Sequence, residues 1–294
     1  MLHYIHMKGH ISHFSAAMMW NIPYIESVIG DDALGCDSSD ITVNSYNARF
    51  RINGKKVRST KLVLPEKSVK TLNGKRVSSP ELLFLELANR LDIHRLILLG
   101  LQLCSHPPGN PSLAVTTKQK LEKFVSKTPG HRGHKKALRA LKYIENGSAS
   151  IMESLAYMIL TLPYVLGGYG MRGAIFNYEV KLNNDMSIRL KQDRCFVDLY
   201  FKQAKVGVEY DSFAHHNRPS EQGKDSVRSA ILGRQGIEIL HMNTIQLYDK
   251  NACRDFAHNL AARLGKRIHI RTRKFEQMHN HLRTLLPVRS NVCF

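Results

Sequence analysis

The sequence predicts an α+β protein, with a helical and β-ribbon N-terminal half and an αβββαβ unit in its C-terminal half. Two Asn-Gly pairs between β-type residues predict hairpins in the first half, and alternating helix and strand patterns fill the second. The 294 residues are enough for two domains of ordinary size. We expect a basic domain over 1–147, a second domain over 148–264 and a basic tail over 265–294.

The first half begins with an apolar segment and continues into two basic ribbons. ISHFSAAMMWNIP predicts a short helix that ends at Pro23. RINGKKV and TLNGKRV follow, and because Asn and Gly tolerate the positive φ of a type I′ turn, residues 49–76 are expected to form paired ribbons. Their ten Lys or Arg residues, against Glu66 alone, would allow a ribbon to lie along a phosphate backbone.

Three helices complete this half. Ser79 as N-cap, Pro80 at the first helical position and Glu81 near the positive end of the dipole predict a helix over SSPELLFLELANRL. TTKQKLEKFVSK predicts a second helix. HKKALRALKYIENG has basic residues on one side and apolar residues on the other, which predicts a basic amphipathic helix. The segment NGSAS after it marks the domain boundary.

The second half alternates between helix and strand patterns. SIMESLAYMILTL predicts a helix, IFNYEVKL a strand and NND a turn, followed by strands over MSIRLK, CFVDLYF and VGVEYD. After a loop, GKDSVRSAILGRQG predicts a helix, IEILHMN a strand and TIQLYDKNACRDFAHNLAARLG a trailing helix. The basic remainder could dock on the domain or extend from it.

The charge of the chain indicates a polyanionic partner. The formal charge is +19, from 43 Lys and Arg against 24 Asp and Glu. Residues 1–48 hold one basic residue and five acids, whereas residues 49–147 hold 21 basic residues and six acids. Duplex DNA is the expected partner, and the alternatives are a solubility charge or an acidic protein partner. The candidate nucleic-acid contacts are Arg49, Arg51, Lys55, Lys56, Arg58, Lys61, Lys135, Lys136, Arg139 and Lys224.

Other features argue against several classes of protein. The five cysteines are scattered and form no C-x-x-C pair, so neither a disulfide framework nor a thiolate zinc site is indicated. No run approaches the roughly 18 to 20 apolar residues of a membrane helix, and the N-terminus lacks a signal-peptide core, so we expect a cytoplasmic protein without a membrane partner. GGYGMRG precedes a strand instead of following one and no P-loop is present, so no nucleotide cofactor is expected.

Four histidines near the N-terminus have helical spacing. His3, His6, His10 and His13 fall at steps of three, four and three, which on one helix would form a single face. Gly9 interrupts that helix, so a partly buried or anion-facing stripe is favoured over a zinc site.

Three acids fall near the ends of adjacent predicted strands. Asp198 lies in FVDLYF, and Glu209 and Asp211 lie in VGVEYD. The short connection KQAK brings these strands side by side, and positions two apart on a strand share a face. Like charges this close need a cation, a proton or a compensating base. Carboxylates suit Mg²⁺ or Mn²⁺, which would lower the pKa of a bound water for attack on a phosphodiester.

The order of these patterns over residues 148–250 resembles a known family. ES in the first helix, VDLYF, VGVEYD, the following HH and KDSVRSAILGRQGIEIL are similar to relatives of the very-short-patch repair endonuclease, in the PD-(D/E)XK nuclease superfamily. The resemblance implies a restriction-endonuclease-like fold, metal ligation by Asp198 and Glu209, a supporting acid at Glu153 and a catalytic histidine at His216. More weakly, the N-terminal half resembles the winged-helix domain of AbiEi-type antitoxins, which implies a winged-helix-like fold for 1–147.

One feature departs from the superfamily pattern. The superfamily lysine belongs two residues after the strand glutamate, where this chain has Asp211. An acid cannot neutralise transition-state charge as lysine does. Lys205 at the strand start, or Lys224 and Arg228 on the following helix, could supply the cation instead.

Each candidate also has a purely structural alternative. Glu153 follows Ser150 by three residues, which is the spacing of a capping box. Asp211 could form a turn at the strand end, and Asp198 and Glu209 could be ordinary ion-paired acids.

The favoured hypothesis is a Mg²⁺- or Mn²⁺-dependent DNA endonuclease, in phage defence or DNA repair. Asp198, Glu209 and Asp211 would hold the metal, His216 would act as general acid or base, and Arg228 or Lys224 would contact phosphate. The alternative is a non-catalytic, antitoxin-like DNA-binding regulator with a decayed nuclease domain. The missing lysine favours this alternative and the retained acids oppose it. A nuclease acting on RNA would differ in substrate alone.

Overall fold

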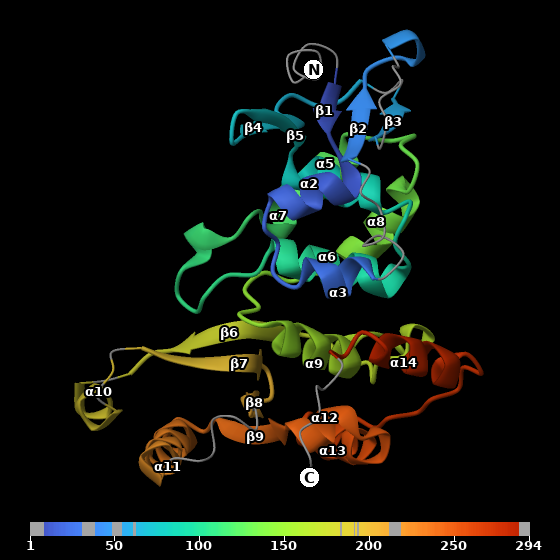
Figure 1. The fold of residues 1–294 in the computed structure, drawn as a ribbon. Helices are drawn as coiled ribbons and strands as arrows, with labels where there is room; N and C mark the ends of the chain where they lie inside the picture. Colours follow the sequence, from blue (N-terminus) through green and yellow to red (C-terminus); the bar gives the residue numbers. More distant parts are fainter. Residues whose placement is uncertain are drawn as a thin grey trace. The chain divides into compact units, whose positions relative to one another are not determined.

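A computed structural model describes residues 9–30, 39–48, 55–60, 63–182, 184–190, 192, 194–211 and 219–287 (Figure 1). The chain forms two compact units. Unit 1 comprises residues 1–105 and 112–146, and unit 2 comprises residues 106–111 and 147–294. Both contain helices and a mixed sheet, so the α+β class is confirmed. None of the helices in the described ranges has the length and apolarity needed to cross a membrane.

Unit 1 is built on a five-stranded mixed sheet with the order β3-β2-β1-β5-β4. In Figure 1 the strands lie together at one end of the unit, next to α2 and α5. The strands are β1 (Gly9–Ile11), β2 (Ser39–Val43), β3 (Lys55–Ser59), β4 (Val69–Leu72) and β5 (Lys75–Ser78). The helices are α2 (His13–Met19), α3 (Ile25–Ile29), α5 (Pro80–Leu87), α6 (Ile93–Leu103), α7 (Lys118–Ser126) and α8 (His134–Leu141).

The second of the two predicted Asn-Gly turns is confirmed. β4 and β5 form an antiparallel hairpin with Leu72 opposite Lys75, and the two turn residues, Asn73 and Gly74, have φ values of 50° and 71°. Positive φ at both positions is what a type I′ turn requires. The first Asn-Gly pair lies outside the described residues. β3, which follows it, pairs in parallel with β2. The position of β3 in the sheet is therefore set by a strand that lies earlier in the chain.

The N-cap predicted at Ser79 is confirmed. The Ser79 hydroxyl accepts a hydrogen bond from the Leu82 N–H at 3.2 Å, with Pro80 as the first helical residue. The Thr117 hydroxyl caps α7 in the same way. The core consists mainly of leucines of α5 and α6, which are almost fully buried.

The histidine stripe does not form on one helix. His10 lies on β1 and His13 begins α2, because Ser12 ends the extended segment and serves as the N-cap position of the helix. The helical interpretation of this spacing is therefore wrong for these two residues. His3 and His6 lie outside the described residues.

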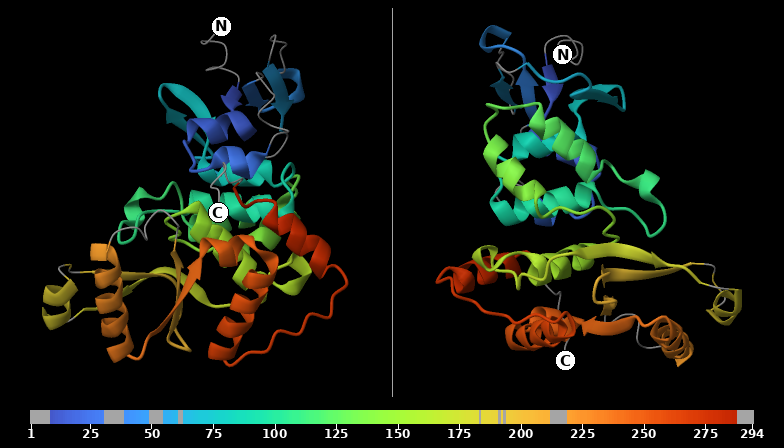
Figure 2. Two further views of the ribbon diagram at one scale, coloured as in Figure 1. Left: turned by 60° about the horizontal axis from the view of Figure 1, so that its bottom comes forward. Right: turned by 180° about the vertical axis from the view of Figure 1, so that it is seen from behind.

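Unit 2 contains a four-stranded sheet with the order β6-β7-β8-β9, in which only β8 and β9 are parallel among the described pairs. The elements are α9 (Ile151–Thr161), β6 (Ala174–Val180), α10 (Asn184–Leu190), β7 (Cys195–Phe201), β8 (Val206–Asp211), α11 (Pro219–Arg234), β9 (Glu238–Asn243), α12 (Thr244–Tyr248), α13 (Lys250–Arg263) and α14 (Phe275–Arg283). Helix α9 packs against β7 and β8. Figure 2 shows α11 alongside β9, which it contacts.

One expected strand of this unit is a helix. The segment MSIRLK was predicted to be extended, but residues 184–190 form α10. Its apolar residues at 186 and 190 satisfy helical as well as alternating spacing, and the polar residues before them suit a helix start better than a turn. Asp185, in the first turn, is favoured there by the helix dipole.

The basic C-terminal segment docks on unit 2. Helix α14 packs against α9 and the 3₁₀ helix Tyr164–Leu166, and it buries Phe275 and Leu282. His279 is also buried, where its Nδ1 lies 2.7 Å from the carbonyl oxygen of Gly167. Helix α14 therefore contributes buried side chains to the core of unit 2, whereas most of residues 265–274 are exposed.

Candidate active site

The carboxylates of unit 2 gather where α9, β7 and β8 pack together. Asp198 lies on β7, Glu209 and Asp211 lie on β8, and Glu153 lies in the first turn of α9. Glu153 and Glu209 are buried, each with 8% of its surface exposed. The strand-end acids named from the sequence are thus accompanied by the helix acid.

Glu153 combines a capping contact with a place near Asp198. The Ser150 hydroxyl accepts from the Glu153 N–H at 3.1 Å, and Glu153 Oε2 accepts from the Ala149 N–H at 2.9 Å and from Asn177 Nδ2 at 2.8 Å. Burial, followed by the charge of Asp198, nevertheless raises the pKa of Glu153 to about 7. Only half of the expected capping box forms, because the Glu153 side chain accepts from the Ala149 N–H instead of the Ser150 N–H, and this contact does not exclude a role in proton transfer.

Asp198 is held at the end of the β7–β8 ladder. Its Oδ2 accepts a hydrogen bond from the Tyr210 N–H at 2.9 Å, so a side chain takes the place of a backbone partner there. Burial raises its pKa and the charge of Asp211 adds to this, whereas the Tyr210 hydrogen bond and the charge of Arg228 oppose it.

Glu209 is paired with a cation from α11. Arg228 Nη2 lies 2.6 Å from Glu209 Oε1, and Arg228 Nη1 donates to Glu209 Oε2 at 2.8 Å. Arg228 also donates to the Phe196 carbonyl oxygen and to Cys195 Sγ. Burial, with the charge of Asp198 adding to it, outweighs Arg228 and raises the pKa of Glu209 to about 7.

Asp211 is paired with a residue that sequence reasoning missed. His241 Nδ1 lies 2.9 Å from Asp211 Oδ2, and both side chains are partly exposed. The β8–β9 register places His241 beside Glu209, 32 positions earlier in the chain. Only the parallel pairing of β8 with β9 brings them together, and no sequence signal gives that register.

These acids form an electrostatic cluster instead of a closed set of metal ligands. Among the described residues, no three of them bring ligand oxygens within 4.8 Å of one another. Arg228 supplies the one strong opposite charge that reaches Glu209 in the described part of this site. A divalent cation would have to draw the carboxylates closer, and carboxylate oxygens suit Mg²⁺ or Mn²⁺.

The remaining candidates for the site lie elsewhere or outside the described residues. His216 is not among the residues described, and the side chain of Lys224 on α11 is not described either. Lys205 lies in the turn at the start of β8, at the opposite end of the strand from Asp211. Of the cations considered, the structure brings Arg228 to the carboxylates.

The expected nucleic-acid contacts are described only in part. Arg58 forms an ion pair with Asp40 at 2.9 Å, and Lys136 Nζ donates to the Leu91 carbonyl oxygen at 2.8 Å. Lys135 and Arg139 are exposed on α8. The positions whose side chains lie outside the described residues are Arg49, Arg51, Lys55, Lys56 and Lys61.

Comparison of the chain with protein families, with curated proteins and with solved structures finds no match in any of the three.

Proposed function

We propose that unit 2 is a metal-dependent phosphodiesterase that acts on duplex DNA, with Mg²⁺ or Mn²⁺ held by Asp198, Glu209 and Asp211. One observation carries the proposal: the buried carboxyls of Glu153 and Glu209 both have pKa values raised to about 7, with Asp198 contributing to each. Burial is the main cause of both shifts, the charge of Asp198 adds to it, and Arg228 does not offset the two at Glu209. A divalent cation would add positive charge that opposes both shifts.

The residues of the site suit particular parts of such a reaction. Glu153, with a pKa near 7, can exchange a proton at neutral pH, which a general acid or base must do. Arg228, anchored by Phe196 and Cys195, fixes the orientation of Glu209 and adds a positive charge beside the carboxylates, where it would attract a phosphate. The metal, when bound, would lower the pKa of a water molecule and offset charge on the phosphorus.

The restriction-endonuclease-like and winged-helix-like assignments belong to the same proposal. The order of α9, β6, β7, β8, α11 and β9 supports it, because it follows the αβββαβ succession with α10 inserted. The exposed Lys135 and Arg139 of α8 would contribute phosphate contacts to a basic unit 1. A cytoplasmic role in phage defence or DNA repair would fit such an enzyme.

The test is cleavage of supercoiled plasmid DNA with Mg²⁺ or Mn²⁺. The wild-type protein should convert it to the nicked form, and Asp198→Asn should reduce the rate at least a hundredfold while leaving the protein folded. Asp255→Asn, which removes an equally negative but exposed side chain on α13, should nick at the wild-type rate. Equal rates for all three proteins, or no nicking by any of them, would rule the proposal out.

A second function is favoured by the Arg228–Glu209 pair. Because a guanidinium already neutralises the strand glutamate, unit 2 could persist as a folded support for a DNA-binding regulator. That protein would bind duplex DNA with the same affinity in Mg²⁺ and in EDTA, and would leave plasmid intact. Metal-dependent nicking that Asp198→Asn abolishes would exclude it.

A further inference from the structure

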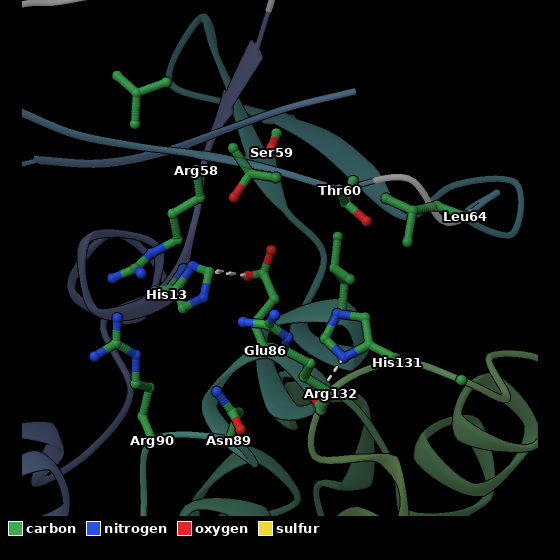
Figure 3. A pocket seen from close by; sticks show the side chains of 14 residues that line it. His13, Arg58, Ser59, Thr60, Leu64, Glu86, Asn89, Arg90, His131 and Arg132 are labelled. Carbon is green, nitrogen blue, oxygen red and sulfur yellow. Dashed lines mark hydrogen bonds and ion pairs between the residues drawn. The ribbon is translucent and has the colours of Figure 1, made fainter. Parts of the chain in front are cut away.

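Unit 1 contains a cavity of about 680 Å³, far larger than a water site and within the range of small-molecule sites. Figure 3 shows its side chains, which come from β3, the start of α2, the end of α5 and the turn before α8. Its wall is about equally polar and apolar, and the apolar part is formed by Val57, Leu64 and Leu82. A cavity of this kind suits a ligand with one charged and one apolar part.

Three guanidinium groups from separate elements line the cavity. Arg58 lies on β3, Arg90 follows α5 and Arg132 lies in the turn before α8. Arg58 pairs with Asp40, but its Nε is buried and has no hydrogen-bond partner. In the part of the chain that the structure describes, neither Arg90 nor Arg132 has an ion-pair partner. The cavity therefore has positive charge that the described residues of unit 1 leave without an ion-pair partner.

The position of Arg132 depends on a glycine. Gly133 has a φ of 90°, and a Cβ at this position would lie 2.7 Å from the Asn89 N. Only glycine lets this turn approach the residues just before Arg90 so closely. The backbone thus brings two cationic side chains from distant parts of the sequence to one cavity.

An acceptor lies in the same wall. Glu86 Oε2 accepts hydrogen bonds from the Ser78 hydroxyl at 2.9 Å and from the His13 N–H at 3.1 Å. Glu86 Oε1 lies 3.7 Å from His10 Nε2, beyond hydrogen-bond distance, and accepts no hydrogen bond from any described residue. A carboxylate oxygen has room for two donors, so Oε1 can receive an N–H from a ligand.

We propose that this cavity binds a nucleoside monophosphate, with its phosphate at Arg90 and Arg132 and an N–H of its base at Glu86 Oε1. The phosphate is a dianion, which suits two free guanidiniums, and the base can lie against the apolar wall. Inorganic phosphate would leave most of the cavity empty. The expectation of no nucleotide cofactor came from missing backbone motifs, whereas here side chains make the contacts.

This site lies entirely in unit 1 and does not depend on the chemistry of unit 2. The nucleotide has two possible sources, a free mononucleotide or the phosphorylated end of a nucleic-acid strand. Both present the same phosphate and base.

Calorimetric titration of the full chain with AMP, CMP, GMP and UMP tests the proposal. At least one nucleotide should bind saturably at one site per chain, and Arg90→Gln with Arg132→Gln should weaken it by roughly tenfold or more per guanidinium lost. The matched control is Lys123→Gln with Lys127→Gln, which removes the same charge from exposed positions of α7. It should bind as the wild type does. Because all four positions are exposed, each variant should keep the wild-type melting temperature.

Titrations with further ligands show which parts of the nucleotide the cavity recognises. Ribose 5-phosphate and adenosine should each bind at least tenfold more weakly than the best nucleotide. If a 5′-phosphorylated hexanucleotide binds more tightly than AMP, the natural ligand is the end of a nucleic-acid strand. If AMP binds more tightly, the natural ligand is a free mononucleotide. The proposal is overturned if no mononucleotide binds, if the two double variants lose affinity equally, or if inorganic phosphate or a free amino acid binds as tightly.

Discussion

Two buried glutamates, one in each unit, differ in the direction of their pKa. Glu86 of unit 1 is 4% exposed and Glu209 of unit 2 is 8% exposed, so burial opposes the charged form of both. His10 and His13 nevertheless hold the pKa of Glu86 below its ordinary value, whereas that of Glu209 rises to about 7. The neighbours that act most on Glu86 among the described residues are histidines, while Glu209 shares its surroundings with Asp198 and Asp211. Because burial acts on both carboxyls, the hydrogen bonds and charges around each one decide the direction in which its pKa moves.

Removing Arg228, the arginine that pairs with Glu209, is the strongest test of this difference between Glu86 and Glu209. Arg228→Met should lower the free energy of unfolding by about 3 kcal/mol or more at pH 8, because it leaves Glu209 buried without an opposite charge. Urea unfolding measures this. Adding Glu209→Gln to the variant should recover most of the loss.

The control for this variant is an exposed arginine of the same unit. Arg254 lies 4.0 Å from Asp255 on α13, and both side chains are more than half exposed. Arg254→Met should change the free energy of unfolding by less than about 1 kcal/mol. A loss at Arg228 no larger than this would show that water already screens Glu209.

The second prediction uses pH. Glu209 has a folded pKa of about 7, above its ordinary 4.5, so the folded state binds more protons than the unfolded state between these values. The free energy of unfolding should therefore fall as pH rises from about 5 to 8, by up to about 3 kcal/mol from this group. Glu209→Gln should flatten this part of the curve of stability against pH.

Glu86 should behave in the opposite way. Its folded pKa lies below 4.5, so its stabilising contribution is present above that pH and is lost as pH falls through the folded pKa. Glu86→Gln should lower stability at pH 7 and reduce the loss on acidification. If Glu86→Gln and Glu209→Gln change the curve of stability against pH in the same pH range, the opposite pKa directions of the two glutamates are wrong.

The third prediction concerns metal. Mn²⁺ should raise the melting temperature of the wild-type protein, with a stabilisation of about 2.7 kcal/mol when free metal is a hundred times Kd. Asp211→Asn and Asp198→Asn should shrink this increment, because each removes a ligand. Glu86→Gln should keep it, since Glu86 lies in the other unit. An increment unchanged by Asp198→Asn would place any bound metal elsewhere.

The sequence predicted elements best where local signals decide them. Ser79 with Pro80 and the Asn73–Gly74 turn act over a few residues, and both were found as expected. The parallel pairing of β2 with β3 was missed because no local pattern records a partner 16 residues away. For α10, alternating and helical spacing were both possible, and the polar residues that begin the helix were interpreted as a turn.

The same limit applies to the candidate site. Asp198 and Glu209 could be named because a short hairpin joins their strands, and β7 and β8 do pair. His241 and the cavity around Glu86 depend on contacts between distant segments. From the sequence, Arg228 was one of several residues that could supply a cation, and its pairing with Glu209 was not predicted.

The smallest expected effect concerns the partner of Asp211. His241 is 43% exposed and Asp211 22%, so their contact at 2.9 Å is largely screened by water. His241→Gln should change the free energy of unfolding by less than about 1 kcal/mol at pH 6. His241 contacts Asp211 but is not one of the proposed metal ligands, so the variant should keep the Mn²⁺-induced rise in melting temperature that Asp211→Asn loses. Thermal unfolding of both variants with and without Mn²⁺ separates the two effects. If His241→Gln abolishes the metal response as fully as Asp211→Asn does, His241 is needed to hold Asp211 in place or binds the metal itself, and the ligand set proposed for unit 2 must include it.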